Sequence, residues 1–311
     1  MRGSSAIRVA AWGAVVLGAA APLVRRRLGL TPPIVTAAAA TAPFALVVAA
    51  PRSRLRDVAV VCLQMNAYVA NYEMPHDDAE RQAARVRVRY PIVADRILGK
   101  GDLPGLRLQR AFARRQGQPL RAFEQVLVWT HWLWFVVPHG TVAYLLFRRR
   151  ELFAGGAAQM YAVFDLGLVG YWALPTAPPW YAGEIGALGS EDPSMRRMMR
   201  EHGEAFWKGA WGPLYDALAG NPLAAMPSLH FATSVMAAHL LADAGPVQGA
   251  LGWTYAVTLG FALVYLGEHY VVDLLAGLAL AEGVRRNRNR AAPALRAVSR
   301  VVQRLEARVQ A

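Results

Sequence analysis

The segment from Met226 to Asp273 decides the fold, and it reads MPSLHFATSVMAAHLLADAGPVQGALGWTYAVTLGFALVYLGEHYVVD. It contains two apolar stretches, 227–243 and 249–266, each close to the roughly 20 residues that cross the hydrocarbon core of a bilayer. The short break between them carries a Gly-Pro pair at 245–246, which favours a turn. The segment therefore predicts two antiparallel membrane helices joined by a tight turn.

Two histidines and an aspartate lie near the ends of this segment. His230 and His269 are 39 residues apart, which corresponds to one crossing and one return at about 1.5 Å per residue. Both histidines are therefore expected at the same membrane face. His269 and Asp273 are four residues apart and share one face of a helix. Polar groups in membrane helices are costly, so their convergence favours a functional site.

This group of residues has a clear chemical interpretation. The Asp273 carboxylate can accept a hydrogen bond from one ring nitrogen of His269, which fixes the tautomer and leaves the other nitrogen free to attack. His230 can then protonate a leaving oxygen. Phosphorus is the better target, since no oxyanion hole for acyl transfer is visible. Two alternatives stay open: a His-x-x-x-Asp metal site, for which no third ligand has matching spacing, and purely structural histidines.

The composition of the 311-residue chain favours a membrane protein. Of its residues 55% are hydrophobic and 18% are charged, whereas a soluble domain carries about a quarter charged residues. The formal net charge is +13, and all but two of the 34 basic residues are arginines that lie between apolar stretches. This spacing suits an anionic lipid surface and argues against nucleic acid as a partner. The single cysteine, Cys62, excludes an intramolecular disulfide and a cysteine-based zinc site.

Charge-free stretches predict an all-α integral membrane protein, a polytopic bundle of about 6–8 transmembrane helices. The expected spans are 7–24, 31–50, 57–72, 123–147, 152–174, 227–243, 249–266 and 268–284. We divide the chain into N-terminal helices with an interfacial segment (1–121), a catalytic membrane core (122–285) and a basic cytoplasmic tail (286–311). The first span is either a signal peptide or a retained helix, and Pro22 after the alanine run 19–21 favours retention.

Basic residues near the span ends predict the orientation. Clusters at 148–150 and 285–290 are expected on the cytoplasmic side, so the loop 175–226 faces outward. The basic segment 77–121 then also falls outside, and we interpret it as interfacial helices. The tail predicts an amphipathic helix over 291–311 that either rests on an anionic leaflet or is solvated. The apolar face of that helix consists of Leu295, Val298, Val302, Leu305 and Val309.

Three motifs carry a resemblance to a known family. The Pro-Ser-Leu-His sequence at 227–230 and the His-Tyr-x-x-Asp sequence at 269–273 resemble the second and third motifs of the type 2 phosphatidic acid phosphatase superfamily. Within it, the chain is most similar to the inositol phosphorylceramide synthases, which share a Pro-x-x-Pro-Pro-Trp-Tyr sequence, here at 175–181. The resemblance covers about 171–282 in the expected order, and it implies a helical membrane core of the phosphatidic acid phosphatase type.

The resemblance also implies a role for each of three residues. His269 would be the nucleophile that forms a phosphohistidine, Asp273 would orient it, and His230 would be the general acid and base. The phosphatases of the superfamily bind phosphate with additional cations, but Leu263 stands at the third-motif arginine position and Ala262 at the serine position. Fewer cations suit a singly charged phosphodiester better than a monoester of up to about −2. The sequence thus favours a head-group transferase, with a lipid-phosphate phosphatase as the alternative.

Six further residues are expected to bind phosphate or substrate. They are Ser228, Lys208, Pro178, Trp180, Tyr181 and Asp165. Asp165 lies in the middle of a span, where it lines the substrate path or makes a structural hydrogen bond. Trp180 and Tyr181, together with Trp211, either stack on a sugar ring or anchor the chain at the membrane interface.

Other loop residues can replace the missing cations. These candidates are Lys208, Arg96, Arg110, Arg196, Arg197 and Arg200. Each of them can equally be a solvated loop charge. Asn71, Glu73 and Asp95 can bind a polar head group from the outer N-terminal segment. His131 and His139 are expected to be structural.

We therefore expect a membrane phosphotransferase that moves a phosphoryl head group from a lipid phosphodiester to an alcohol through a phosphohistidine, with inositol lipids as donors by resemblance. No metal and no cofactor are expected, and the partners are lipid substrates and the bilayer. The expected location is a bacterial plasma membrane, with the site on its extracytoplasmic face. Two rival functions remain. The first is a membrane carrier that uses Asp165 as a proton site, whose transport would survive His269→Ala. The second is a scaffold protein, whose properties His230→Ala and His269→Ala would leave unchanged.

Overall fold

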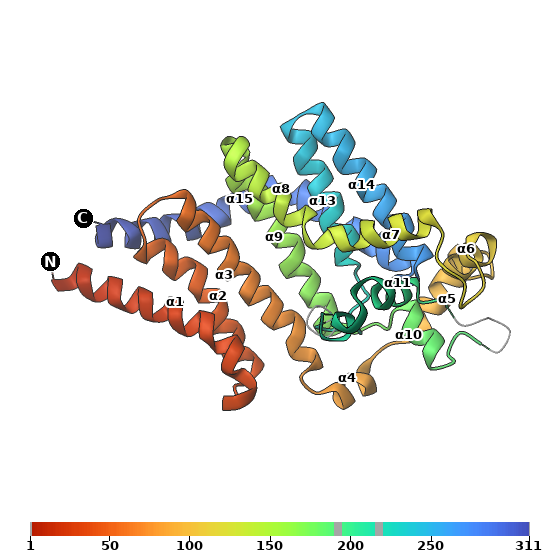
Figure 1. The fold of residues 1–311 in the computed structure, drawn as a ribbon. Helices are drawn as coiled ribbons and strands as arrows, with labels where there is room; N and C mark the ends of the chain where they lie inside the picture. The colour runs from red at the N-terminus through yellow and green to blue at the C-terminus, as the bar shows by residue number, and fades with distance from the viewer. Residues whose placement is uncertain (1, 190–194, 215–219, 311) are drawn as a thin grey trace. The chain divides into compact units, whose positions relative to one another are not determined.

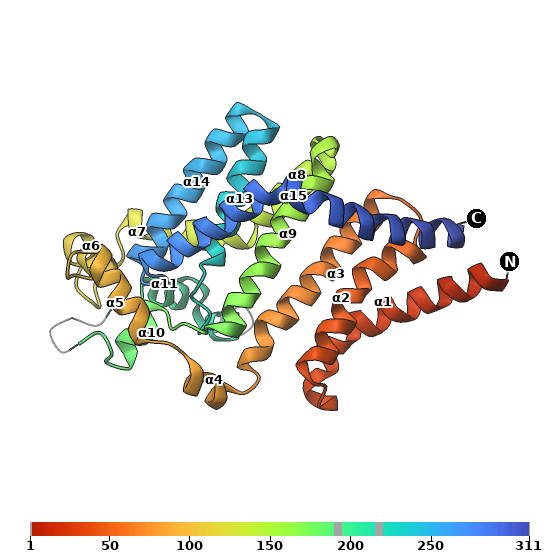
Figure 2. The same ribbon diagram turned by 180° about the vertical axis from the view of Figure 1, so that it is seen from behind.

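The computed structural model describes residues 2–189, 195–214 and 220–310, and these are almost entirely helical. In the described ranges the only β-type pairings are isolated bridges of Thr176 with Arg87 and with Ala224. The chain forms two compact units, 1–79 with 286–311 and 80–285. Figure 1 and Figure 2 show the helices of each unit from opposite sides.

The first unit is built from three helices and the end of the last one. These are α1 (Arg2–Leu28), α2 (Pro32–Ala49), α3 (Arg54–Glu73) with the 3-10 turn η1 (Met74–His76), and the C-terminal part of α15 (Val271–Gln310). Small residues let α1 and α2 approach closely: a Cβ added at Gly18 would overlap the Ala38 carbonyl. This close approach is typical of helices that pack inside a membrane.

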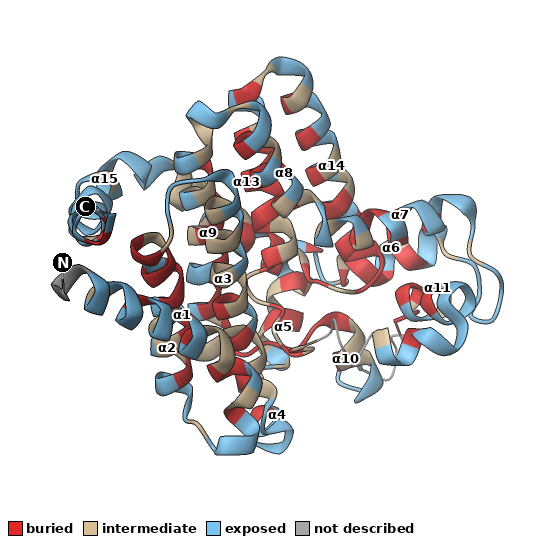
Figure 3. Cartoon of the chain, turned by 60° about the vertical axis from the view of Figure 1, so that its left-hand side comes forward, coloured by how far each residue is buried: buried red, intermediate tan, exposed pale blue. Residues whose placement is uncertain are grey.

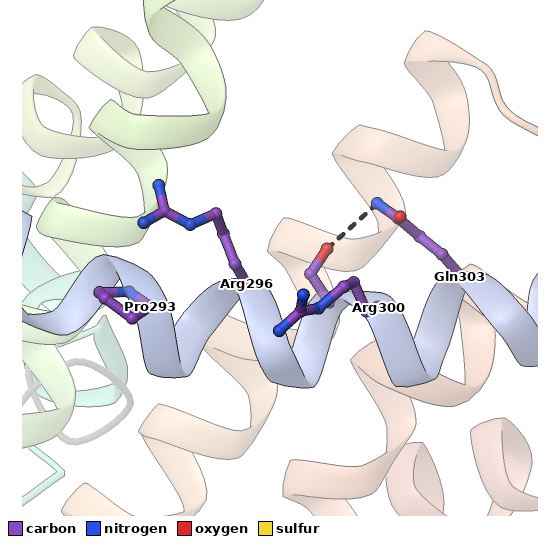
Figure 4. A pocket seen from close by; sticks show the side chains of 5 residues that line it. Pro293, Arg296, Arg300 and Gln303 are labelled. Carbon is purple, nitrogen blue, oxygen red and sulfur yellow. Dashed lines mark hydrogen bonds between the residues drawn. The ribbon is translucent and has the colours of Figure 1, made fainter.

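The tail half of α15 belongs to this first unit. Val302 and Val309 of its apolar face pack against Ile7 and Ala11, and Val48 completes the cluster. The carboxylate of Glu306 forms ion pairs with the guanidinium groups of Arg52 at 3.0 Å and Arg56 at 2.6 Å. Leu295 and Val298, by contrast, are 56% and 51% exposed. A surface hollow of about 350 Å³ on this segment is lined by Pro293, Arg296, Ser299, Arg300 and Gln303 (Figure 4).

The second unit contains the remaining helices. They are α4 (Ala79–Arg85), α5 (Arg89–Leu98), α6 (Pro104–Phe112), α7 (Ala122–Trp132), η2 (Leu133–Phe135), α8 (Val137–Arg148), α9 (Arg150–Ala173), α10 (Pro179–Glu184), α11 (Met198–Trp207), η3 (Lys208–Ala210), α13 (Leu229–Ala244), α14 (Pro246–Tyr265) and the first part of α15. The antiparallel pair expected from the 226–273 segment is present as α13 and α14, side by side in both views (Figures 1 and 2). Glycines permit their close contact, since a Cβ at Gly249 would lie 2.8 Å from the Ala242 Cα and one at Gly252 would lie 2.8 Å from the Ala238 Cα.

The centre of the second unit is α13, which is buried along most of its length (Figure 3). Helices α8, α9 and α14 pack around it. Residues of α14 that face away from α13 are apolar and exposed; Leu251 and Val257 are both 66% exposed. Large exposed apolar side chains along one helix fit contact with lipid chains.

Four of the described helices are long and apolar enough to cross a membrane, which supports an integral membrane protein. They are Ser5–Leu28, Pro32–Ala49, Arg150–Ala173 and Pro246–Tyr265. The larger count of about 6–8 spans stays a prediction. Helix α3, at 20 residues, is longer than the span expected over 57–72 and is about as long as a bilayer crossing requires, whereas α13 has 16 residues.

Two expected elements differ from the observed ones. The span expected over 123–147 is interrupted, because α7 ends at Trp132, η2 follows, and Pro138 lies in the first turn of α8. The last span and the tail, expected as separate helices, form the single 40-residue helix α15, which continues through Pro293. The interfacial segment is helical as predicted, in the short helices α4, α5 and α6, and its position at the membrane surface stays a prediction.

Candidate active site

The residues predicted to carry the chemistry lie together in the second unit. The Nδ1 atom of His269 is 3.2 Å from Oδ2 of Asp273, and its Nε2 atom is 3.3 Å from Nδ1 of His230. Asp273 is fully buried and His269 is 4% exposed, whereas His230 is partly exposed. The three side chains thus form one chain of contacts that reaches the surface at His230.

The Pro-Ser-Leu-His sequence places His230 at the start of α13. Ser228 is the N-cap of this helix, and its hydroxyl accepts a hydrogen bond from the Phe231 N–H at 3.3 Å. The Ser228 N–H donates to the Asp273 backbone carbonyl at 3.0 Å, and so ties the two motifs together. Ser228 is buried, so its observed role is to hold the two helix ends together.

The turn before α15 places His269. The N–H groups of Glu268 and His269 both donate to the Leu263 carbonyl, at 3.0 and 3.1 Å. Gly267 has φ of 77°, which favours glycine, and a Cβ there would lie 2.5 Å from the Met195 side chain. The Tyr270 N–H donates to Oδ2 of Asp273 at 2.9 Å. These bonds fix His269 just before α15 begins and its carboxylate partner Asp273 in the first turn of that helix.

Helix α5 contributes a contact that the sequence did not reveal. The Asp95 carboxylate accepts hydrogen bonds from the backbone N–H groups of Val271 at 3.1 Å and Val272 at 2.9 Å, in the first turn of α15. Asp95 is 1% exposed. Burial raises the pKa of Asp95 to about 6, against the two hydrogen bonds, which lower it. The predicted head-group contact of Asp95 is therefore replaced by capping of the helix that carries Asp273.

The Pro-x-x-Pro-Pro-Trp-Tyr sequence lies against the same turn. Both backbone groups of Thr176 are hydrogen-bonded to the segment before α13. Its N–H donates to the Leu223 carbonyl at 3.2 Å, and its carbonyl accepts from the Ala225 N–H at 3.0 Å. The N–H of Trp180, in the first turn of α10, donates to the Gly267 carbonyl at 3.1 Å. Pro178 is the buried N-cap of α10, and Tyr181 is partly exposed. The motif therefore supports the turn that carries His269.

Aromatic rings surround His230. The ring of Trp134 lies 4.2 Å from it, centroid to centroid, and the indole N–H donates to the Thr233 hydroxyl at 2.8 Å. The ring of His131, which is on α7, lies 4.8 Å from that of His230, centroid to centroid. The sequence predicts a structural role for His131, because no spacing rule links it to His230, 99 residues further along the chain.

The structure explains why the usual arginine is missing from the third motif. Leu263 is fully buried and packs with Leu259, Val264 and Leu274, which leaves no polar surroundings for a charge. Ala262 beside it is also fully buried.

Most of the candidate replacement cations are engaged by protein groups. Arg196 forms an ion pair with Glu201 at 2.6 Å and donates to the carbonyls of Arg114 and Gln118. The other ion-pair or carbonyl contacts are Arg200 with Glu204, Arg110 with Asp102, and Arg96 with the Leu188 carbonyl. Lys208 is exposed as the first residue of η3, directly after α11, and within the described ranges no hydrogen bond or ion pair joins it to the histidines.

Arg197 is the candidate cation whose charge acts on a residue next to His269. Its guanidinium lies 3.9 Å above the Trp180 ring and pairs with the Glu184 carboxylate at 2.7 Å. It also lies within electrostatic range of Glu268, the residue before His269. Trp180 thus carries a cation on its face in this structure, where the sequence offered a choice between stacking on a sugar ring and anchoring at the interface.

The remaining predicted residues lie elsewhere. Asp165 is exposed on α9, and Trp211 is buried against Trp132 at 5.8 Å between ring centroids. Asn71 and Glu73 are in the first unit. The side-chain amide oxygen of Asn71 accepts a hydrogen bond from the Thr36 hydroxyl, and the Glu73 carboxylate pairs with the Arg25 guanidinium at 2.9 Å.

Comparison with known proteins identifies the family. A family model described as the PAP2 superfamily matches residues 110–284, more than half of the chain, and the chain belongs to this superfamily. The phosphoinositol dihydroceramide synthase of Bacteroides thetaiotaomicron is 31% identical over 129 residues, which cover 37% of this chain and 39% of that protein. The inositol phosphorylceramide synthase catalytic subunit aur1 of Schizosaccharomyces pombe is 27% identical over 123 residues, which cover 37% of this chain and 28% of that protein.

These matches confirm the predicted superfamily and the predicted likeness to the inositol phosphorylceramide synthases. The matched segments span well under half of each relative. No solved structure matches the chain.

Proposed function

We propose that this protein is a membrane phosphotransferase that moves a phosphoryl head group from a lipid phosphodiester to an alcohol through a phosphohistidine. The observation that carries the proposal is the Asp273–His269–His230 contact chain at the edge of a helical PAP2-type core. A carboxylate, a nucleophilic imidazole and a second imidazole at hydrogen-bond distance are the groups that a two-step phosphoryl transfer needs.

The first step forms the covalent intermediate. Nε2 of His269 attacks phosphorus, the bond from phosphorus to the lipid oxygen breaks, and His230, in its protonated imidazolium form, gives one ring proton to that oxygen and becomes neutral. Asp273 holds the proton on Nδ1 of His269 and stabilises the positive charge that develops on the ring. The phospho head group then remains on His269, and the lipid alcohol leaves.

The second step returns the enzyme to its starting state. The acceptor alcohol gives its proton to His230 while its oxygen attacks phosphorus, and the bond between phosphorus and Nε2 of His269 breaks. No proton is gained or lost over the cycle, since His230 recovers from the acceptor the proton it gave to the first alcohol. The reaction is therefore balanced without a metal or a cofactor.

A singly charged phosphodiester is the substrate class that the site supports best. The buried Leu263 cannot hold phosphate, and all five candidate arginines are engaged by carboxylates or carbonyls. A phosphomonoester of charge up to about −2 would need more compensation than a diester. The names of the two relatives supply the donor and acceptor to test first, an inositol phospholipid and a ceramide.

The decisive experiment traps the intermediate. Purified full-length protein is incubated with phosphatidylinositol labelled at phosphorus, with and without ceramide. We expect acid-labile label on the wild-type protein and on His139→Phe, none on His269→Ala, and transfer to ceramide when it is present. Turnover without any label on His269 would overturn the covalent mechanism, and release of free phosphate from phosphatidate at a higher rate would favour the phosphatase alternative.

We also propose that the site faces outward from a bacterial plasma membrane. The basic clusters at 148–150 and 285–290 support this orientation because cytoplasmic loops are rich in Arg and Lys. In a Cys62→Ala background, a membrane-impermeant maleimide applied to intact cells is expected to label Ala187→Cys and to leave Arg288→Cys unlabelled. The reverse pattern would place the site on the cytoplasmic side.

A further inference from the structure

His131 is a buried histidine whose ring nitrogens have no hydrogen-bond partner among the described residues. It lies on α7 and is 5% exposed, and neither Nδ1 nor Nε2 has a hydrogen-bond partner within the described chain. An imidazole carries at least one N–H donor in every protonation state that occurs near neutral pH. Leaving a buried polar group unpaired costs about 1–3 kcal/mol, so a buried donor of this kind implies a partner that comes from outside the chain.

The position of His131 indicates what that partner is. Its ring centroid lies 4.8 Å from that of His230 with 33° between the ring planes, and the His230 ring lies 5.4 Å from that of His269. Three histidine rings from α7, α13 and the turn before α15 therefore meet at one place. Any phosphoryl group that His269 attacks and whose leaving oxygen His230 protonates must lie beside both rings, and hence close to His131.

The charge around the site makes a hydrogen-bond donor valuable there. The arginine position of the third motif is the buried Leu263, and Arg196 and Arg200 are held in ion pairs with Glu201 and Glu204. The non-bridging oxygens of a phosphodiester share one negative charge and accept hydrogen bonds from neutral donors. An imidazole N–H can supply such a bond without adding the second cation that a monoester requires.

We propose that His131 is a substrate-binding residue whose ring N–H donates a hydrogen bond to a non-bridging oxygen of the phosphoryl group. The inference rests on the proposed function and deepens it, because it names the group that holds the phosphodiester in place of the missing arginine. His131 thereby acts on binding and on the transition state and takes no part in the transfer of protons.

Orthovanadate tests the inference directly, because it binds phosphoryl-transfer sites as an analogue of the five-coordinate phosphorus. His131→Phe keeps a flat ring of similar size and removes both nitrogens, whereas His131→Gln restores an amide donor. We expect His131→Phe to weaken orthovanadate binding to the purified full-length protein about tenfold to a hundredfold, as loss of a hydrogen bond to a charged group does. His131→Gln should recover part of this loss.

His139→Phe is the matched control. His139 lies on α8, and its Nδ1 also has no hydrogen-bond partner among the described residues. Its ring, however, stacks on that of Phe164 at 5.6 Å between centroids. We expect His139→Phe to bind orthovanadate as the wild type does. The thermal midpoint of each variant is measured alongside, and His131→Phe should not fall below wild type, because removing unpartnered nitrogens from a buried ring costs no hydrogen bond within the protein.

The outcomes separate this inference from the proposed function. If wild-type protein transfers a head group and His131→Phe binds orthovanadate as tightly as wild type, the inference is wrong, the proposed function stands, and the partner of His131 is buried water. If no lipid phosphodiester is turned over but orthovanadate binding still depends on His131, the transferase proposal fails and the phosphoryl contact stands. A loss of binding in His131→Phe that is matched by a loss of folding, with no recovery in His131→Gln, would also overturn the inference.

Discussion

Nδ1 of His230 lies 3.3 Å from Nε2 of His269, although the two residues are 39 positions apart in the chain. A carboxylate only accepts hydrogen bonds, so His269 must donate from Nδ1 to Asp273. A neutral imidazole then has only a lone pair on Nε2, and His230 must donate to it. In the proposed mechanism, the lone pair of His269 that attacks phosphorus accepts this bond from His230, the proposed proton donor, so a substrate has to displace the contact between the two rings.

The division of labour between the two histidines predicts different responses to the leaving group. His230→Ala should lower the rate of transfer from a lipid diester about 10²–10⁴-fold, as loss of a general acid does. With a 4-nitrophenyl phosphodiester, whose leaving group needs no proton, the loss in formation of the phosphohistidine should be much smaller. His269→Ala should abolish the reaction with both substrates.

The measurement is the initial rate of nitrophenol release beside the rate of lipid transfer for each variant. Equal losses for the two substrates in His230→Ala would contradict its role as the acid. Activity of His269→Ala toward either substrate would contradict the nucleophile assignment.

Capping of α15 by Asp95 predicts a positioning role. Asp95→Ala leaves the partly buried N–H groups of Val271 and Val272 without this acceptor, which should cost about 3–6 kcal/mol for two hydrogen bonds to a charged group. We expect a lower thermal midpoint and a lower kcat, since the capped turn immediately follows His269. Asp95→Asn, which keeps one acceptor oxygen, should lie between wild type and Asp95→Ala.

The matched control is Asp102→Asn. Asp102 lies in the loop after α5 with a 30% exposed side chain and pairs with Arg107 and Arg110, and exposed pairs contribute about 0–1 kcal/mol. Little change in midpoint or kcat is expected for it. If Asp95→Ala kept full kcat at a temperature where it is folded, the capping contact would have no positioning role.

The sequence predicted those parts of the site that depend on one continuous segment. The spacing from His230 to Asp273 and the Gly-Pro break were enough to predict α13, α14 and the convergence of the two histidines. Asp95 and His131 reach the site through packing of distant helices, and no periodicity places an aspartate from α5 on the first turn of α15. Their positions depend on tertiary contacts that a single sequence does not display.

Helix boundaries show a similar limit. Pro138 indicates the interruption between α7 and α8, because a proline disfavours a helical conformation in the residue before it. The continuous apolar run around Pro138 nevertheless predicts a single span. The last span is predicted to end where its hydrophobicity ends, yet the 40-residue helix α15 runs on through the arginine-rich stretch after Gly283, and even Pro293 does not end it. A change of solvent environment does not itself end a helix.

Close packing of α15 on α13 predicts the effect of one added methyl group. A Cβ at Gly277 would lie 2.5 Å from the Ser228 carbonyl oxygen, and this backbone atom cannot rotate away. Gly277→Ala should therefore push the two helices apart at the point where Ser228 also bonds to Asp273. We expect a destabilisation of about 1–3 kcal/mol and at least tenfold lower kcat.

Gly283→Ala is the control on the same helix, where an added Cβ meets no atom within 4 Å. It should keep wild-type kcat and gain up to about 1 kcal/mol in stability from the higher helix propensity of alanine. The test is kcat and thermal midpoint of both variants in the same detergent. Full activity in Gly277→Ala would mean that the spacing of α13 and α15 does not set the histidine geometry.

The ion pairs of Glu306 predict a pH-dependent attachment of the tail. Hydrogen bonds from Arg52 and then Arg56, although burial opposes them, hold the pKa of Glu306 at about 2, below its ordinary value of 4.5. Because the folded-state pKa is lowered, the stabilisation is fully present above about pH 4.5 and is lost as the pH falls toward 2. A nitroxide on Val301→Cys, in a Cys62→Ala background, should report a restrained tail at pH 7 that becomes mobile over this range.

Glu306→Gln separates this contact from general acid unfolding. It removes the carboxylate at every pH, so its tail should already be mobile at pH 7, whereas Arg300→Gln, which changes an arginine of the exposed hollow, should remain restrained. A tail that is equally restrained in Glu306→Gln and in wild type would mean that the packing of Val302 and Val309 holds it without the ion pairs. In that case the apolar contacts alone would fix the C-terminal half of α15.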